Sequence, residues 1–144
     1  DVYSAIVHSK MDVAANMRAT IADMSLSPIE KIKQIPVTYA ENLISLGYTG
    51  KVLVTQMFNL LKVNKWLDQD PVQAVSALLT TTDEYKEQAD IIALNIATAF
   101  RGAMFEYALN IDDQVLFDRY TEEYFLKTSE ELVENILKQY QISS

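Results

Sequence analysis

Apolar residues recur every three or four positions along nearly the whole chain, which is the spacing of an amphipathic α-helix. The pattern first appears between Tyr3 and Met24, where the apolar stripe consists of Val13, Ala14, Met17, Ile21 and Met24. It is clearest in the second half of the chain, at Ile92, Ile96, Phe100 and Met104. The spacing therefore predicts a chain built from helices.

Capping residues and prolines predict where the early helices begin and end. Ser27 is placed to cap a helix with Pro28 at its first position, and Glu30 completes a capping box with Ser27. Pro36 lies inside the same pattern. Because proline lacks an N–H and its ring clashes with the preceding turn, we expect a kink or a break there. Gly47 is placed to end the helix in a left-handed conformation.

The remaining helices are predicted over residues 50–67, 71–79 and 83–109. A further helix after Asp112 carries Leu116, Tyr120, Tyr124 and Phe125, and a last helix passes through Leu132, Ile136 and Tyr140. Their starts carry residues that cap helices, namely Thr49, Asp70 before Pro71, Thr81 with Glu84, Asp112, and Thr128 with Glu131. Asn110 is placed to end the longest helix, and Gly102 is a second position at which we expect a bend. Short connections make consecutive helices antiparallel neighbours. The prediction is an all-α fold, a compact antiparallel bundle of five to seven helices forming one domain over residues 1–144.

Composition changes this picture mainly by what it excludes. The chain has 144 residues, of which 49% are hydrophobic, enough to bury a core without a metal or a disulfide. It has no cysteine and one histidine, which excludes thiol nucleophiles and the common zinc sites. Only three glycines are present, and no glycine-rich phosphate loop occurs. No apolar run is long enough to span a membrane. We expect no cofactor, no metal and no transmembrane segment.

The single histidine is the one candidate for a catalytic base of ordinary type. His8 has Ser4 four residues before it and Asp12 four residues after it, which is the composition of a catalytic triad. That spacing places all three on one face of a straight helix and does not aim a nucleophile at a substrate. We interpret His8 as a surface or boundary residue and assign no catalytic residue.

Acidic residues crowd the end of the chain, at Asp112, Asp113, Asp118, Glu122, Glu123, Glu130, Glu131 and Glu134. A calcium-binding EF-hand loop needs glycine at its sixth position, whereas a loop starting at Asn110 has Val115 there. A pair of carboxylates could also serve a hydrolase. A solvated acidic face is the commoner arrangement, so we predict neither a metal site nor an enzyme.

The charge is unevenly distributed, and the imbalance indicates a kind of partner. The net charge is −8; residues 1–72 hold seven acidic and seven basic side chains, whereas residues 73–144 hold thirteen and five. An acidic chain of this kind is a poor ligand for nucleic acid. Molecules with such a charge distribution can associate head to tail at a rate that salt suppresses. Acid would relieve repulsion between the acidic halves, so we expect acid-promoted self-association.

Aromatic residues and methionines leave two alternatives open. The aromatics of the second half, including Phe105, Tyr107, Tyr120 and Phe125, cannot all face one side of a helix. Methionine packs irregular or changing surfaces well. One alternative is therefore a small carrier that holds a lipid or other apolar ligand between its helices. The other is an intracellular bundle that binds another protein in an apolar groove.

Three segments of the second half carry a family resemblance. They are Val72-Gln73-Ala74-Val75-Ser76, then Ala97-Thr98-Ala99-Phe100 through Ala103-Met104-Phe105, and then the joint Asn110-Ile111-Asp112. Over about residues 72–126 the order resembles the helical non-repetitive domains of spidroins, the spider silk proteins, and aciniform-type repeats in particular. The resemblance implies a soluble, secreted, non-enzymatic structural module that keeps silk protein soluble and associates during spinning. It transfers no site residues, and the residues themselves leave a cytoplasmic location open.

Overall fold

The computed structural model describes residues 15–63, 71–110 and 120–141. Every regular element in these residues is a helix. Residues 15–22 are helical and are followed by α2 (Pro28–Ser45), α3 (Tyr48–Val63), α4 (Pro71–Thr80), the 3-10 turn η1 (Lys86–Gln88), α5 (Ala89–Ala108) and α6 (Glu122–Lys138). The predicted all-α fold is confirmed.

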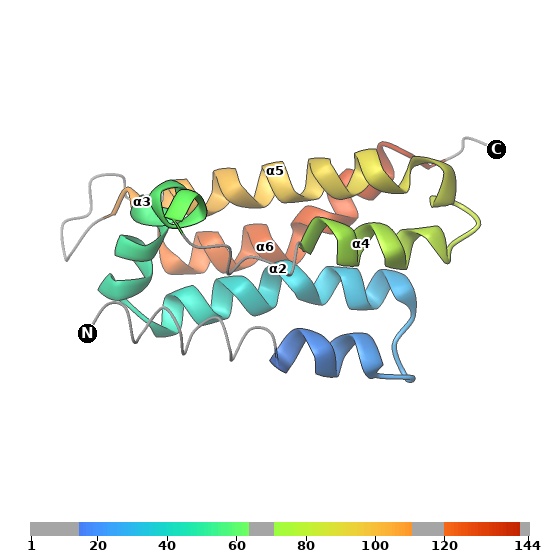
Figure 1. Ribbon diagram of the computed structural model, residues 1–144, viewed down its shortest axis with the longest axis horizontal. Helices are drawn as coiled ribbons and strands as arrows, with labels where there is room; N and C mark the ends of the chain where they lie inside the picture. Colours follow the sequence, from blue (N-terminus) through green and yellow to red (C-terminus); the bar gives the residue numbers. More distant parts are fainter. Residues whose placement is uncertain (1–14, 64–70, 111–119, 142–144) are drawn as a thin grey trace.

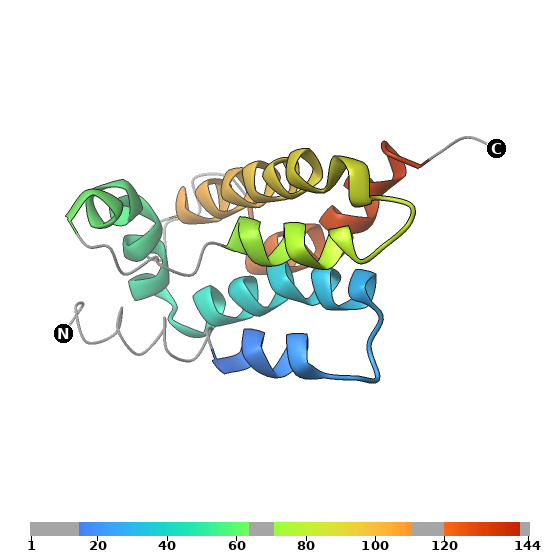
Figure 2. The ribbon, with the colours of Figure 1, turned by 45° about the vertical axis from the view of Figure 1, so that its right-hand side comes forward.

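Four helices lie side by side and form the body of the bundle. Figures 1 and 2 show α2 and α5 running in one direction and α4 and α6 in the other, as the short connections predict. The closest packing is between α2 and α6, between α4 and α5, and between α5 and α6. Residues 15–22 lie along the side of α2, and α3 turns across one end of the bundle (Figure 1).

The start of α2 follows the sequence prediction in detail. The Ser27 hydroxyl accepts a 3.2 Å hydrogen bond from the Glu30 amide, and the Glu30 carboxylate accepts a 3.1 Å bond from the Ser27 amide. These two reciprocal bonds satisfy donors that the first turn of a helix cannot pair internally. Of the predicted kink or break at Pro36, the break is wrong, because α2 continues through Pro36 to Ser45, and the kink stays a prediction. Pro36 removes one helical hydrogen bond, but it is buried, and packing on both sides of it holds the helix together.

Two glycines shape the corner between α2 and α3. Gly47 has a φ of +58° and its amide bonds to the Ile44 carbonyl, so the predicted left-handed helix end is confirmed. The next helix begins immediately at Tyr48, so Thr49 lies inside α3 and the prediction that it caps the helix is wrong. A Cβ at Gly50 would lie 2.4 Å from the Leu43 carbonyl oxygen. The corner therefore needs a residue without a side chain at this position.

The long helix α5 begins six residues later than the capping pattern predicts. The Thr81 hydroxyl donates to the Leu78 carbonyl at 2.6 Å instead of capping a new helix, and the Thr82 hydroxyl accepts from the Tyr85 amide at 3.2 Å. These local bonds form a turn that competes with the helix. The backbone then passes through η1 into α5 at Ala89. From there α5 is continuous through Gly102, and it ends before Asn110 as predicted.

Within residues 120–141, one helix runs through the position at which the sequence predicts that a last helix begins. The Thr121 hydroxyl accepts from the Tyr124 amide at 3.1 Å and caps α6, which continues past Thr128. The predicted cap at Thr128 is therefore wrong. The next residue, Ser129, is fully buried, and its hydroxyl donates to the Phe125 carbonyl of the preceding turn. This bond satisfies the Ser129 hydroxyl inside the helix, so Thr128 and Ser129 do not interrupt α6. The predicted cap at Asp112 lies outside the described residues.

The core confirms the apolar stripe of the long helix and corrects that of the first. Ile92, Ile96, Phe100 and Met104 are all buried, as are Leu132 and Ile136 of α6. In the first stripe, Met17 is buried, but Ile21 is 37% exposed and Met24 is 94% exposed. The helix there ends at residue 22, so the periodic pattern extends past the helix that it predicts.

Candidate association surface

The candidates for chemistry that the sequence singled out divide into two groups. His8 with Ser4 and Asp12, and the aspartates Asp112, Asp113 and Asp118, lie outside the described residues, so their interpretation stays a prediction. The glutamates of α6, namely Glu122, Glu123, Glu130, Glu131 and Glu134, are all exposed. Among the described residues, no group of three potential ligand side chains could hold a metal ion.

The exposed glutamates of α6 form an acidic face with little internal compensation. Lys138 lies 4.0 Å from Glu134, and both side chains are more than half exposed. An exposed pair of this kind contributes little to stability because solvent and salt screen it. The net negative charge of the face is therefore available to act on other molecules.

A second acidic group occupies the turn between α4 and α5. It consists of the exposed residues Asp83, Glu84, Glu87 and Asp90, with Lys86 3.6 Å from Asp83. Asp90 also has a structural role, because its carboxylate accepts a 2.5 Å hydrogen bond from the Ser76 hydroxyl of α4. This bond joins the two helices just above the turn and fixes where the acidic group sits.

The described side chains keep the charge imbalance of the sequence. Among the described side chains, those of residues 15–56 carry three carboxylates and four basic groups. The described side chains of residues 72–141 carry ten carboxylates and four basic groups. The excess negative charge therefore belongs to the α4–α5 turn and to α6, while residues 15–22, α2 and the described part of α3 are close to neutral. We call the exposed acids of the α4–α5 turn and α6 together the acidic surface.

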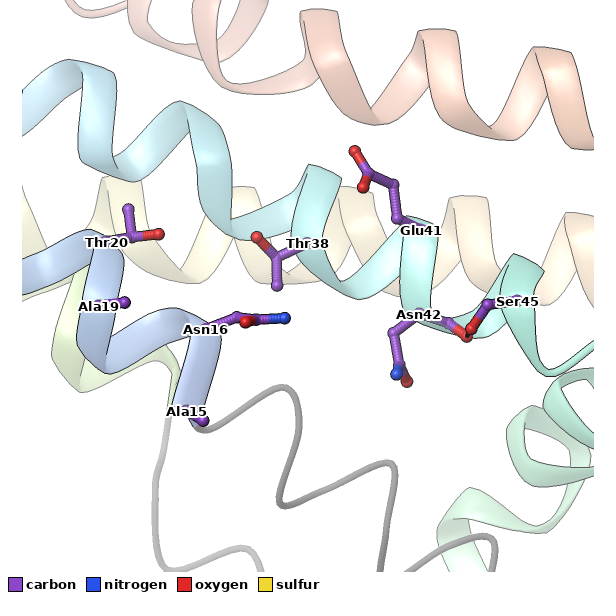
Figure 3. A pocket seen from close by; sticks show the side chains of 8 residues that line it. All are labelled: Ala15, Asn16, Ala19, Thr20, Thr38, Glu41, Asn42 and Ser45. Carbon is purple, nitrogen blue, oxygen red and sulfur yellow. Dashed lines mark hydrogen bonds between the residues drawn. The ribbon is translucent and has the colours of Figure 1, made fainter.

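One cavity among the described residues has a polar lining. It has a volume of about 570 Å³ and lies between residues 15–22 and α2, where Asn16 and Asn42 reach into it from the two helices (Figure 3). Its lining is completed by Ala15, Ala19, Thr20, Thr38, Glu41 and Ser45. A second cavity of about 310 Å³ lies at the surface beside η1. Neither lining contains an aromatic side chain or a methionine.

One buried side chain has a perturbed ionisation. The Tyr107 ring stacks on Phe125 with centroids 4.7 Å apart, and Lys51 of α3 lies 5.2 Å from the ring centroid. The Tyr107 hydroxyl has no hydrogen-bond partner in the described part of the chain. Burial, with a smaller contribution from Glu122, raises the Tyr107 pKa to about 12. The phenol therefore stays neutral at physiological pH and cannot serve as a base there. Sequence reasoning placed Tyr107 among the aromatics but had no signal for its unpaired hydroxyl.

The structure also bears on partners. No described helix combines the length and the apolar character needed to cross a bilayer. Comparison of the chain with protein-family models, with curated proteins and with solved structures found no match.

Proposed function

We propose that this chain is a non-enzymatic assembly module, a spidroin-like silk domain whose work is to stay soluble and then to self-associate in response to pH and salt. The observation that carries the proposal is the division of charge across the folded bundle. Ten described carboxylates gather on the α4–α5 turn, α5 and α6, and the other described helices are nearly neutral. Repulsion between such acidic surfaces keeps copies apart at neutral pH.

The direction of the pH effect follows from the sign of this charge. Acid protonates carboxylates and removes part of the repulsion, so association should strengthen as the pH falls. Salt screens the attraction between the acidic surface of one copy and the basic side chains of residues 15–56 of another, so head-to-tail association should become slower at high ionic strength. The resemblance of residues 72–126 to spidroin domains supports the same kind of work, and secretion belongs to the proposal on that ground.

The cavities favour an assembly module over a lipid carrier. A carrier needs an enclosed site lined mainly by apolar side chains. The 570 Å³ cavity is instead lined by asparagine, threonine, serine, glutamate and alanine. The polar side chains of this lining can form hydrogen bonds with water, whereas a bound acyl chain would leave them without partners.

Solution mass by light scattering tests the proposal, with the protein at pH 7 and pH 5, each at low and high salt. We expect a monomer at pH 7 and a shift to dimer at pH 5, with slower association in high salt. A variant with Glu130, Glu131 and Glu134 changed to Gln should associate already at pH 7. Equal association at both pH values, or a monomer in all four conditions, would contradict the proposal.

A further inference from the structure

The outward side of α5 carries apolar residues that the bundle does not use. Ile91 and Leu94 are each 50% exposed, and Leu109, the residue that caps the end of α5, is 45% exposed. At 100° per residue, these three side chains share one face with Thr98 and Gly102, opposite the buried residues. We call the five residues the α5 outer face. Their spacing of three, four, four and seven positions is that of a helix that packs along a second helix.

Nothing in the described residues requires glycine at position 102. Glycine is the least favourable residue inside a helix after proline. A Cβ at Gly102 would meet no atom within 4 Å, and the only glycine with positive φ is Gly47. Neither packing nor backbone conformation therefore requires glycine at Gly102. A residue without a side chain at the middle of an exposed apolar face allows another backbone to approach closely.

The charges beside this face identify the second helix. Arg101 lies along one edge of the α5 outer face, and Glu106 lies along the other edge, five residues further on. If a second copy packs its own α5 alongside in the same direction, Arg101 of each copy lies beside the partner's Glu106, the spacing of edge charges in parallel paired helices. Pairing in opposite directions, with the faces fully overlapped, would instead bring the two arginines together.

We infer that the α5 outer face is a self-association surface on which a second copy of this chain packs its own α5 side by side and in the same direction. The inference deepens the proposed function and rests on it. The acidic surface governs how readily copies meet, and the α5 outer face supplies the short-range contact. Because apolar contact is not screened by ions, this pairing should persist in salt that slows the encounter.

The first test places a charge on the α5 outer face. Dissociation constants are measured by sedimentation at pH 5 and high salt for the wild type, for Leu94→Glu and for Met24→Glu. Both variants add one negative charge at an exposed apolar residue, but Met24 lies in the turn between residues 15–22 and α2. Leu94→Glu should weaken the dimer at least about tenfold, while Met24→Glu should change it less than about twofold. Far-ultraviolet circular dichroism of each monomer verifies folding.

The second test addresses direction. Arg101→Glu should weaken the dimer several-fold, because each new glutamate faces the partner's Glu106. The double variant Arg101→Glu/Glu106→Arg should restore it, because the pair is only exchanged. Lys127→Glu makes the same change in net charge on α6 and is the matched control. Pairing in opposite directions predicts no comparable loss, because Arg101→Glu would only replace one pair of like charges, Arg101 against Arg101, by another.

The outcomes separate the pairing through the α5 outer face from the proposed function. If the Leu94→Glu variant dimerises as tightly as the wild type, the inference is overturned and the assembly module stands. An Arg101→Glu dimer as tight as the wild-type dimer would overturn the parallel arrangement. A wild-type monomer in every condition would remove both the inference and the proposed function.

Discussion

Substitution of the three glycines by alanine should have three different effects on the free energy of unfolding, and Gly102→Ala should be the stabilising one. Gly102 is exposed in the middle of α5, where an added methyl group meets nothing within 4 Å. Alanine is favoured over glycine inside a helix by about 1 kcal/mol. With an unfolding entropy of about 2.1 cal/mol/K per residue, 144 residues turn that gain into a rise of about 3 °C in melting temperature.

The other two glycines provide controls within the same chain. Gly50→Ala forces a Cβ to within 2.4 Å of the Leu43 carbonyl oxygen, a backbone atom that cannot move without opening the corner between α2 and α3. Overpacking of this kind costs about 1–3 kcal/mol, which outweighs the gain in helix propensity. Gly47→Ala places a side chain at a φ of +58° and should cost about 1 kcal/mol.

Thermal unfolding followed by circular dichroism, at pH 7 and low protein concentration, measures all three variants as monomers. The same Gly102→Ala variant should weaken self-association about fivefold or more, because its methyl groups separate the paired helices. Stabilisation of the monomer with loss of the dimer is the signature expected. A Gly102→Ala monomer that is less stable than the wild type, or a Gly50→Ala monomer that is not, would refute the reasoning.

Four further predictions concern two hydrogen bonds and the buried hydroxyl of Tyr107 with its ionisation. Ser27→Ala removes the capping box of α2 and should lower the free energy of unfolding by about 1 kcal/mol in urea titration. Ser76→Ala removes the bond to Asp90 and should lower it by about 1 kcal/mol, with the loss visible as faster amide exchange at the α4–α5 turn. Tyr107→Phe removes a buried hydroxyl without a partner among the described residues and should leave the protein equally stable or more stable. Because the folded-state Tyr107 pKa is raised from 10.0 to about 12, the wild type should lose stability between pH 10 and pH 12, and Tyr107→Phe should lose less, as measured by urea titration across that range.

The helical class of the fold, the apolar stripes of α5 and α6 and several helix ends could be predicted, because each depends on residues close together in the sequence. Ser27 with Glu30 and Gly47 form their caps from neighbouring residues, and the structure has both. The errors arose where packing or a competing local bond decided. Pro36 is buried within a continuous helix, and Thr81 bonds backward to Leu78 instead of forward. The sequence predicted an excess of acidic residues in the second half of the chain, but not where these residues lie on the folded protein.

The sequence by itself determined that this protein is helical, acidic in its second half and without the residues of common active sites, since periodicity and composition are properties of the chain. Only the tertiary structure decided that Thr128 and Ser129 lie inside one helix, that the Tyr107 hydroxyl is buried without a hydrogen-bond partner in the described residues, and that Gly102 faces outward beside Ile91 and Leu94. The physical reason is that burial belongs to the arrangement of helices. A periodic pattern shows which residues share a face of a helix, but the neighbouring helices decide which faces remain open to another molecule.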